Sequence, residues 1–172
     1  MTRTFGVVLI AGVVVAATIE LFLVRASLPE RVATHFTFDG TPDGWMGRDA
    51  FVVLTIALLA GVGGLFLVLS VFVPRLPDTM LNLPHKRYWL APERRERTRD
   101  AISAMLALMG GVTTTFVYVA FRVILAANRD STPRLTMDRS WLIAAFAVAL
   151  AAVPLSFVLR FRKPPAGDPP AA

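Results

Sequence analysis

The residue types best suited to chemistry lie in a short polar segment around residue 40. His35, Asp39 and Asp43 recur every four residues, and imidazole and carboxylate groups are ligands for divalent cations. This spacing would align the three side chains on a helix, but the Gly and Pro residues among them disfavour one. We therefore expect no metal site. The two Asp residues are expected to shape turns, and His35 to form hydrogen bonds in the loop or with a partner; a cation site is the alternative.

The apolar parts of the chain carry no recognisable catalytic constellation. They contain no Ser–His pair, no paired Asp and no His-Glu-x-x-His motif, and both histidines, His35 and His85, stand alone in loops. The absence of cysteine excludes disulfides, thiolate catalysis and thiolate-bound zinc. We expect a protein that is not an enzyme and that needs no cofactor.

The elements that must position the polar segment are long and apolar. Hydrophobic residues make up 55% of the 172 residues and charged residues 17%, whereas soluble domains are about a quarter charged. A helix needs roughly 20 apolar residues to cross a bilayer, and none of the apolar runs alternates like a barrel strand. The runs lie at residues 5–24, 50–73, 101–126 and 140–159. The sequence therefore predicts an all-α membrane protein, a bundle of four transmembrane helices with a short extended outer loop.

The chain is predicted to form one domain over residues 1–163, followed by a proline-rich, disordered tail at 164–172. Pro74 is expected to close the second span and Pro154 to kink the fourth. A cleaved signal peptide is the alternative for the first span. Its apolar run exceeds the usual length of about 7 to 15 residues, which favours a retained helix.

Positive charge is distributed unevenly between the two sides of the predicted bundle. The N-terminus, the second loop and the C-terminal tail carry eleven Lys and Arg residues, and the first and third loops carry six. Loops rich in Lys and Arg stay on the cytoplasmic side of the membrane, so we expect both termini and the second loop in the cytoplasm. The isoelectric point near 11.0 is then explained by topology and lipid attraction, without direct binding of nucleic acid.

Small residues at helical spacing indicate how the helices pack, because association in lipid depends on close approach. Packing within one bundle is the expected use of these residues, and a homodimer face is the alternative. They are Ser103, Ala107, Gly111 and Thr115 in the third span, Ala57 with Gly61 and Ala60 with Gly64 in the second, and Ala147 with Ala151 in the fourth.

Two ionisable residues, Glu20 and Arg122, lie inside the predicted spans. Each is about one turn from the outer end of its helix, so both sit at a similar depth. Pairing would reduce the cost of burying either charge in lipid. One hypothesis is therefore an ion pair between the first and third helices; the alternative is that each side chain reaches the headgroups separately.

The outer loop combines a strand pattern with turn residues. Val32, Thr34, Phe36 and Phe38 alternate with other residues, which favours a short strand. Asp39-Gly40 and the following Pro-Asp-Gly are typical of turns. We predict that an extracytoplasmic ligand or peptide binds this loop, through His35, Phe36, Asp39, Asp43 and Trp45.

The inner loop combines aromatic and basic residues. Tyr88 and Trp89 are typical of an interfacial anchor, and Lys86 and Arg87 are available to lipid phosphates. Pro92 is expected in the first turn of a helix that continues into the third span. A collar touching lipid is the expected role. A docking surface for a cytoplasmic protein, including Arg94 and Arg95, is the alternative.

Both loops also carry a family resemblance. The outer motifs are Leu28-Pro29, Thr34-His35-Phe36 and Gly40-x-Pro42-Asp43-Gly44-Trp45, and the inner ones are Asn82-Leu83-Pro84 and Tyr88-Trp89-Leu90-Ala91-Pro92. The outer set resembles the bacterial "domain of unknown function 1648", and the inner set resembles an element that often follows it. The resemblance implies a multi-pass protein of the bacterial inner membrane. The best-understood relatives are SdpI-type immunity proteins, longer chains that protect a cell from a secreted toxic peptide and can hold a transcriptional repressor at the membrane.

These observations favour a non-catalytic membrane binding protein of the immunity or sensor type, with a ligand outside and a protein partner inside. A transporter or an accessory subunit of a membrane complex is the alternative. Against it, the four spans show no inverted repeat and no charged pair at mid-membrane.

Overall fold

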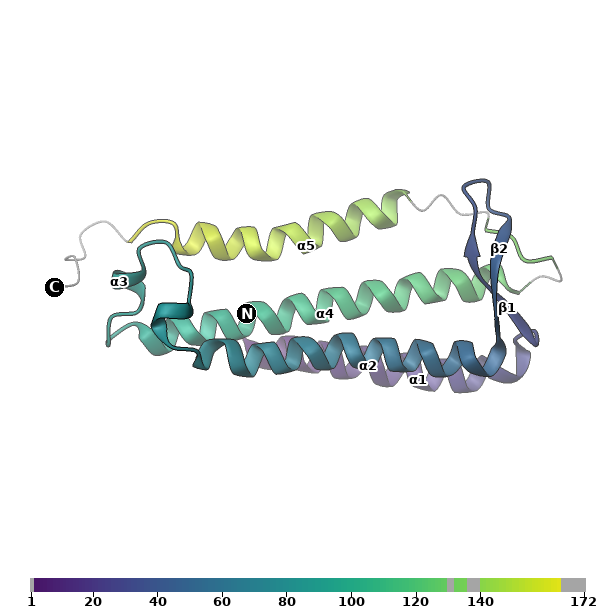
Figure 1. Cartoon of the computed structure of the whole chain (residues 1–172), viewed down its shortest axis with the longest axis horizontal. Helices are drawn as coiled ribbons and strands as arrows, with labels where there is room; N and C mark the ends of the chain where they lie inside the picture. Colours follow the sequence, from purple (N-terminus) through teal and green to yellow (C-terminus); the bar gives the residue numbers. More distant parts are fainter. Residues whose placement is uncertain (1, 130–131, 136–139, 165–172) are drawn as a thin grey trace.

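Four long helices form the body of the protein. The structure is a computed structural model, and it describes residues 2–129, 132–135 and 140–164. The long helices are α1 (Arg3–Val24), α2 (Arg48–Phe72), α4 (Arg95–Ala127) and α5 (Ser140–Phe161), and they run side by side along the length of the molecule (Figure 1). Each is long and apolar enough to cross a membrane. The predicted all-α bundle of four transmembrane helices is confirmed, and the chain is a multi-pass membrane protein.

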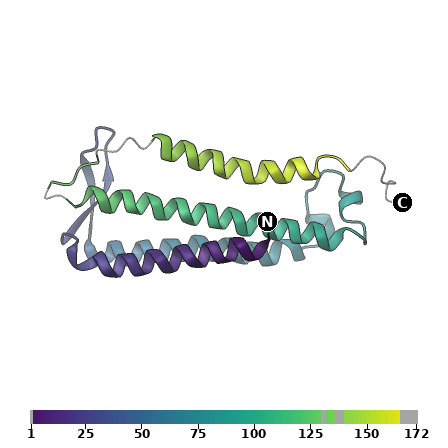
Figure 2. The same cartoon turned by 180° about the vertical axis from the view of Figure 1, so that it is seen from behind.

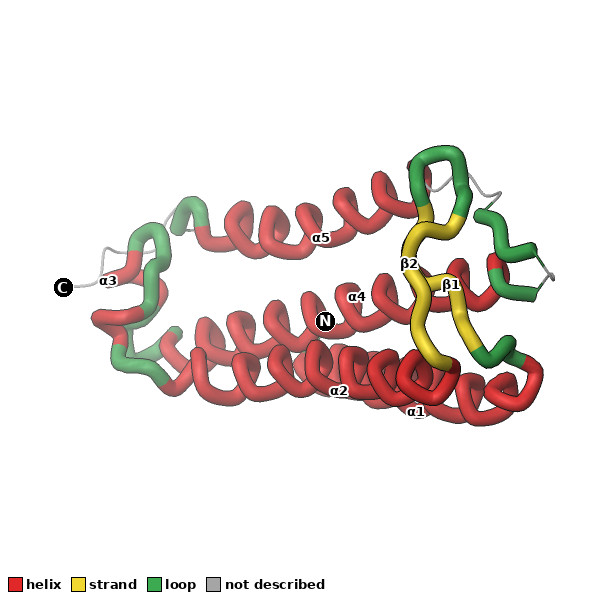
Figure 3. The backbone as a smooth tube through the Cα atoms, turned by 45° about the vertical axis from the view of Figure 1, so that its right-hand side comes forward, coloured by secondary structure: helices red, strands yellow, loops and turns green. Residues whose placement is uncertain are grey.

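The connections between the helices lie at opposite ends of the bundle. A 3-10 turn, η1 (Arg25–Ser27), and two antiparallel strands, β1 (Arg31–Phe36) and β2 (Pro42–Gly47), connect α1 to α2 at one end. At the other end, two 3-10 turns and one short helix connect α2 to α4: η2 (Val73–Arg75), η3 (Asp78–Met80) and α3 (Lys86–Trp89). Figure 3 shows the hairpin and this second connection capping the two ends. The predicted extended outer loop is therefore a β-hairpin.

The tightest packing in the bundle is between α1 and α4. A Cβ atom at Gly6 would lie 2.5 Å from the backbone carbon of Ala107, so these two helices touch backbone to backbone. One turn further along, Gly111 lies against the side chain of Leu9. The hydroxyl of Ser103 also donates a hydrogen bond of 2.6 Å to the carbonyl of Ser70 in α2. Packing within the bundle is thus confirmed for Ser103, Ala107 and Gly111 of the third span, whereas the Thr115 hydroxyl bonds to the carbonyl of Gly111 in its own helix.

The small residues of α2 and α5 face away from the bundle. Cβ atoms added at Gly61 and Gly64 would meet no other atom within 4 Å. Ala57 and Ala60 in α2 are exposed as well. In α5, the pair at 147 and 151 is also exposed. The expectation that these pairs pack inside the bundle is wrong, because other residues face the neighbouring helices, in α2 among them Phe51, Leu59 and Gly63.

Helix α5 lies apart from α1 and α2 and is attached through α4. Figures 1 and 2 show α4 between α5 and the other two long helices. Near the hairpin, the rings of Phe116 and Phe146 stack with centroids 3.7 Å apart. At the other end, the indole nitrogen of Trp89 donates a 3.0 Å hydrogen bond to the carbonyl of Phe161. The helix continues through Pro154. Of the predicted tail, residues 165–172 lie outside the described residues.

Helix α4 begins later than predicted. Pro92 and Glu93 lie in a turn, and the first helical residue is Arg95. The carbonyl of Ala91 accepts hydrogen bonds from the backbone N–H groups of both Arg94 and Arg95. The turn is therefore closed before the helix starts, and Pro92 belongs to the turn.

The close contact at Gly6 generates a test within one helix. Gly6→Leu should push α1 away from Ala107 and destabilise the bundle by about 1 to 3 kcal/mol, the usual cost of overpacking. Unfolding in detergent micelles, followed by loss of helical circular dichroism, would measure the change. Gly12→Leu is the control, because Gly12 meets nothing within 4 Å. Equal losses in the two variants would contradict the assigned contact.

Candidate functional site

The base of the hairpin is fastened to the helices by arginine side chains. The Arg25 guanidinium at the end of α1 donates to the carboxylate of Asp49 at the start of α2, at 2.8 Å. Arg48 reaches back to the carbonyl of Leu28 at 3.0 Å. Its own backbone N–H donates to the carbonyl of Glu30. The chain thus leaves and re-enters the membrane region at one fixed place.

The middle of the hairpin is held by a single buried amide, that of Asn128 at the end of α4. Its Oδ1 accepts from the backbone N–H of Ala33 at 2.8 Å, and its Nδ2 donates to the carbonyl of Ala33 at 2.9 Å. The same Nδ2 donates to the carbonyl of Ile124 at 2.9 Å. Asn128 is 5% exposed and Ala33 is fully buried. The amide therefore serves as a strand partner for β1, whose backbone groups would otherwise be buried without bonds.

The tip of the hairpin is a turn built around Asp39. This carboxylate accepts hydrogen bonds from the hydroxyl of Thr37 and, at 2.8 Å, from the hydroxyl of Thr41. The Thr37 bond, with the help of Thr41, holds the pKa of the Asp39 carboxyl below its usual value. The bonds are therefore at full strength at neutral pH and are lost as the pH falls through the lowered pKa. Asp39 shapes a turn, as predicted. The same prediction is wrong for Asp43, because Pro42, Asp43 and Gly44 lie in strand β2.

The tip is also tied to the connection between α4 and α5. The backbone N–H of Leu135 donates a 3.0 Å hydrogen bond to the carbonyl of Gly40. Gly40 has a φ of +86°, and a Cβ atom there would lie 2.3 Å from the carbonyl oxygen of Leu135. Only glycine satisfies both requirements without strain.

His35 and Asp43 form a polar pair on the exposed side of the hairpin. The distance between His35 Nδ1 and Asp43 Oδ1 is 2.5 Å, and both side chains are largely exposed. Gly44 lies opposite His35 in the ladder, where a Cβ atom would be 2.8 Å from His35 Cβ. The missing side chain at this position lets the imidazole lean across to Asp43.

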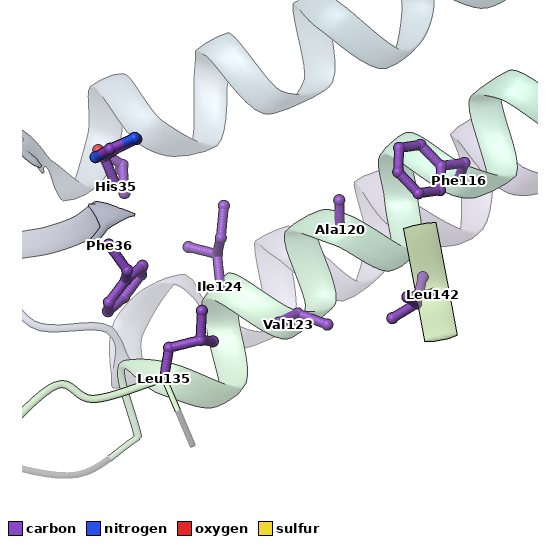
Figure 4. A pocket seen from close by; sticks show the side chains of 9 residues that line it. His35, Phe36, Phe116, Ala120, Val123, Ile124, Leu135 and Leu142 are labelled. Carbon is purple, nitrogen blue, oxygen red and sulfur yellow. The ribbon is translucent and has the colours of Figure 1, made fainter. Parts of the chain in front are cut away.

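Beneath the hairpin, an apolar cavity of about 310 Å³ opens between α4 and the segment around α5. We call this cavity the hairpin groove. Figure 4 shows His35 and Phe36 at one end, the residues of α4 along the wall and Phe116 with Leu142 at the other end. The groove is lined by Thr34, His35, Phe36, Phe116, Ala120, Val123, Ile124, Leu135 and Leu142.

The structure gathers part of the predicted outer-loop site. His35 and Phe36 line the hairpin groove, and Asp43 reaches its rim through His35. Asp39 is engaged in the turn. Trp45 lies on β2, is 42% exposed and has the Arg31 guanidinium 6.0 Å from its ring centroid. In the described part of the chain, no three His, Asp or Glu residues come together closely enough to hold a metal ion.

The wall of the groove and Asn128 were not singled out from the sequence. In the sequence, ordinary residues of an apolar span are all that can be recognised at Phe116, Ala120 and Val123. Only the packing of α5 shows which face of α4 lines the groove. Asn128 reads as a polar residue at a helix end. A polar amide directly after an apolar span was the one available signal.

Glu20 and Arg122 meet between α1 and α4. Arg122 Nε lies 3.2 Å from Glu20 Oε1. The other carboxylate oxygen accepts a hydrogen bond from the Tyr118 hydroxyl. Tyr118 lies one turn before Arg122 on α4, and it was not anticipated as a member of this cluster. The cluster links the two helices that also touch at Gly6 and Ala107.

The inner loop is a packed unit whose aromatic residues are turned inward. Tyr88 is only 6% exposed, and the Arg94 guanidinium lies 3.9 Å from its ring centroid. Trp89 packs edge-on against Phe161, with ring centroids 4.8 Å apart. The interpretation of Tyr88 as a lipid-contacting anchor is wrong, because the loop folds over it. The indole N–H of Trp89 is likewise engaged within the protein, in its hydrogen bond to Phe161 of α5.

Arginine side chains bond to the backbone and to Asp78 in this packed loop. Arg94 donates to the carbonyl of Tyr88 and Arg95 to that of Leu90, both at 3.3 Å. Arg95 and Arg99 also pair with the two oxygens of Asp78, at 3.0 and 2.8 Å. The hydrogen bond from Arg99, and then the nearby positive charges, lower the pKa of the Asp78 carboxyl.

The two remaining inner-loop candidates differ in their contacts. Lys86 Nζ donates to the carbonyl of Thr79 at 2.9 Å. Arg87 is exposed and has no hydrogen bond or ion pair with another described residue.

The fold and the hairpin groove define a small multi-pass membrane protein with a capped, apolar cavity between its third and fourth spans. Residues 6–61 match the family model described as "Domain of unknown function (DUF1648)". The matched segment covers most of α1, the hairpin and part of α2. The match confirms the resemblance at the outer motifs; the inner motifs lie beyond the matched residues. No curated protein and no solved structure matches the chain.

Asn128→Ala should release the hairpin from α4. The substitution removes three hydrogen bonds and leaves the N–H and C=O of Ala33 buried without partners, which should cost roughly 2 to 4 kcal/mol. Hydrogen exchange of the hairpin amides in detergent micelles should accelerate strongly. Asn82→Ala, at an exposed site at the other end of the bundle, is the control. Slow exchange retained in Asn128→Ala would show that the amide does not hold the hairpin.

A charge exchange tests the Glu20–Arg122 pair. Glu20→Arg or Arg122→Glu alone places like charges together in a lipid-facing site and should lower the free energy of unfolding by about 1 to 3 kcal/mol. The double exchange restores opposite charges and should recover most of the loss. Thermal unfolding of the three variants in the same detergent measures the coupling. A double variant no more stable than the singles would refute pairing.

Proposed function

We propose that this protein is a non-catalytic membrane receptor of the immunity or sensor type, and that its ligand is an amphipathic peptide. The hairpin groove carries the proposal. Its walls are almost entirely apolar. Its volume of about 310 Å³ lies at the lower end of the range of volumes found for ligand sites. A space of this size suits one or two large apolar side chains. The His35–Asp43 pair supplies polar contacts at its rim.

The surroundings of the groove support a ligand that arrives from the aqueous side. Phe38 at the tip is fully exposed and Trp45 on β2 is 42% exposed. Exposed aromatic residues beside an apolar cavity favour contact with a second molecule. The hairpin is held at three places, by Arg48, by Asn128 and by Leu135. A hairpin held in place in this way loses little conformational entropy when a ligand binds.

The proposal places the hairpin outside a bacterial inner membrane and both termini in the cytoplasm. The excess of Lys and Arg in the termini and the inner loop supports this orientation. A cytoplasmic protein partner is part of the proposal. Arg87 is the inner-loop candidate most available to it, since Arg94, Arg95 and Tyr88 are engaged within the loop.

Filling the groove tests the proposal. Ala120→Phe places a ring inside the cavity, whereas Ala126→Phe adds the same ring on the same helix at an exposed position outside it. A strain lacking the gene would be complemented with each variant and challenged with a panel of secreted peptides from neighbouring bacteria. The wild type and Ala126→Phe should restore tolerance of at least one peptide, and Ala120→Phe should fail at equal protein levels.

Two outcomes would count against the proposal. If the deletion strain and its parent were equally sensitive to every peptide, the immunity role would be lost. If Ala120→Phe restored tolerance as well as the wild type, the groove would not be the binding site. Equal abundance of the two Phe variants in the membrane excludes misfolding as the cause of a difference.

A further inference from the structure

A second cavity, at the end of the bundle opposite the hairpin, has a different chemistry. It has a volume of about 440 Å³, and we call it the basic cavity. Its charged lining residues are Arg3, Arg97, Arg160 and Asp100. The three arginines come from the first turn of α1, the first turn of α4 and the last turn of α5. The fold therefore concentrates positive charge from three separate helices around one space.

These three guanidinium groups are not neutralised by carboxylates in the described part of the chain. Several other arginines form ion pairs, as Arg25 does with Asp49 and Arg122 with Glu20. Arg3, Arg97 and Arg160 have no such ion pair with a described residue, and all three are exposed. Asp100 alone opposes them in the lining. The basic cavity thus keeps a net positive charge available to an anion.

A groove of about 200 Å³ continues from the basic cavity between α4 and α5; most of its lining side chains are apolar, and Ser156 and Arg160 are the polar ones, so we call it the apolar groove. The two spaces share Ala101, Ala104 and Arg160 in their linings. Beyond this shared part, the groove is lined by Met105, Leu108, Val153, Ser156 and Phe157. A ligand that fills both spaces therefore has an anionic end and an apolar chain.

The position of the two spaces matches the layers of a bilayer. Arg97 and Arg160 lie at helix ends, and the apolar parts of α4 and α5 begin within a turn or two of them. The arginines are thus level with headgroups, and the apolar groove lies beside the first part of the acyl chains. Basic pockets between helices at this depth suit anionic headgroups.

We propose that the basic cavity and the adjoining groove bind an anionic phospholipid. The phosphate pairs with Arg3, Arg97 and Arg160, and one acyl chain lies along the groove between α4 and α5. A free phosphate or nucleotide would leave the apolar groove unused. The positively charged amine of a zwitterionic headgroup would be repelled by the three arginines of the basic cavity. Such a lipid would also join α5 to α1, two helices that are otherwise separated by α4.

Native mass spectrometry of the full chain, titrated with dioleoyl phosphatidylglycerol or dioleoyl phosphatidylcholine, tests the proposal. The wild type should bind phosphatidylglycerol about tenfold more tightly or better, given the usual contribution of each basic residue at a membrane surface. Arg97→Gln with Arg160→Gln should abolish most of this preference. Arg75→Gln with Arg162→Gln removes the same charge at the same end outside the cavity and should preserve it.

A second variant separates the lipid from a bare anion. Ala104→Leu fills the shared part of the two spaces and should weaken phosphatidylglycerol binding several-fold with every arginine in place. Inorganic phosphate, added in excess, should not displace the lipid from the wild type. Equal affinity of the wild type for both lipids, an equal effect of the two arginine pairs, or full displacement by phosphate would each overturn the proposal. The arginine pairs decide the question alone if Ala104→Leu does not fold.

Discussion

The amide of Asn128 completes the hydrogen bonding of β1, which has β2 as its one neighbouring strand in the described part of the chain. In the hydrocarbon layer, backbone polar groups must be satisfied within the protein, and helices do this by themselves. A two-stranded hairpin does not satisfy all of its own backbone groups. The N–H and C=O of the buried Ala33 need a partner where β1 passes the end of α4. Because the side chain of Asn128 supplies both a donor and an acceptor there, irregular structure can lie against the bundle. The groove beneath the hairpin exists because the hairpin is held in this position.

The parts of the fold that depend on length and polarity could be predicted from the sequence. Four apolar runs long enough to cross a bilayer predict four spanning helices. The alternation from Val32 to Phe38, followed by Asp39-Gly40, predicts a strand and a turn, and the observed strand ends at Phe36. Depth along the helices also suggested that Glu20 and Arg122 lie at the same level. Each of these inferences rests on one local property of the chain, and the structure has all of these features.

The rotation of each helix about its axis could not be predicted from local properties. Small residues on α2 resemble those on α4, yet Gly61 faces outward while Ala107 touches Gly6. Aromatic and basic residues in the inner loop have the composition of an anchor, and only the packing of Tyr88 and Trp89 against other parts of the chain shows that they are internal. The groove and the basic cavity depend on the same kind of information, since their linings are assembled from several helices.

The walls of the hairpin groove come from parts of the chain that are synthesised far apart in time. Strand β1 leaves the ribosome early, the face of α4 follows much later, and α5 comes last; the bond between Ala33 and Asn128 joins residues 95 positions apart. Forming a contact between residues so far apart carries a loop-closure cost in entropy. All walls of the groove are present only after α5, the last of its elements, has been synthesised and has packed against α4.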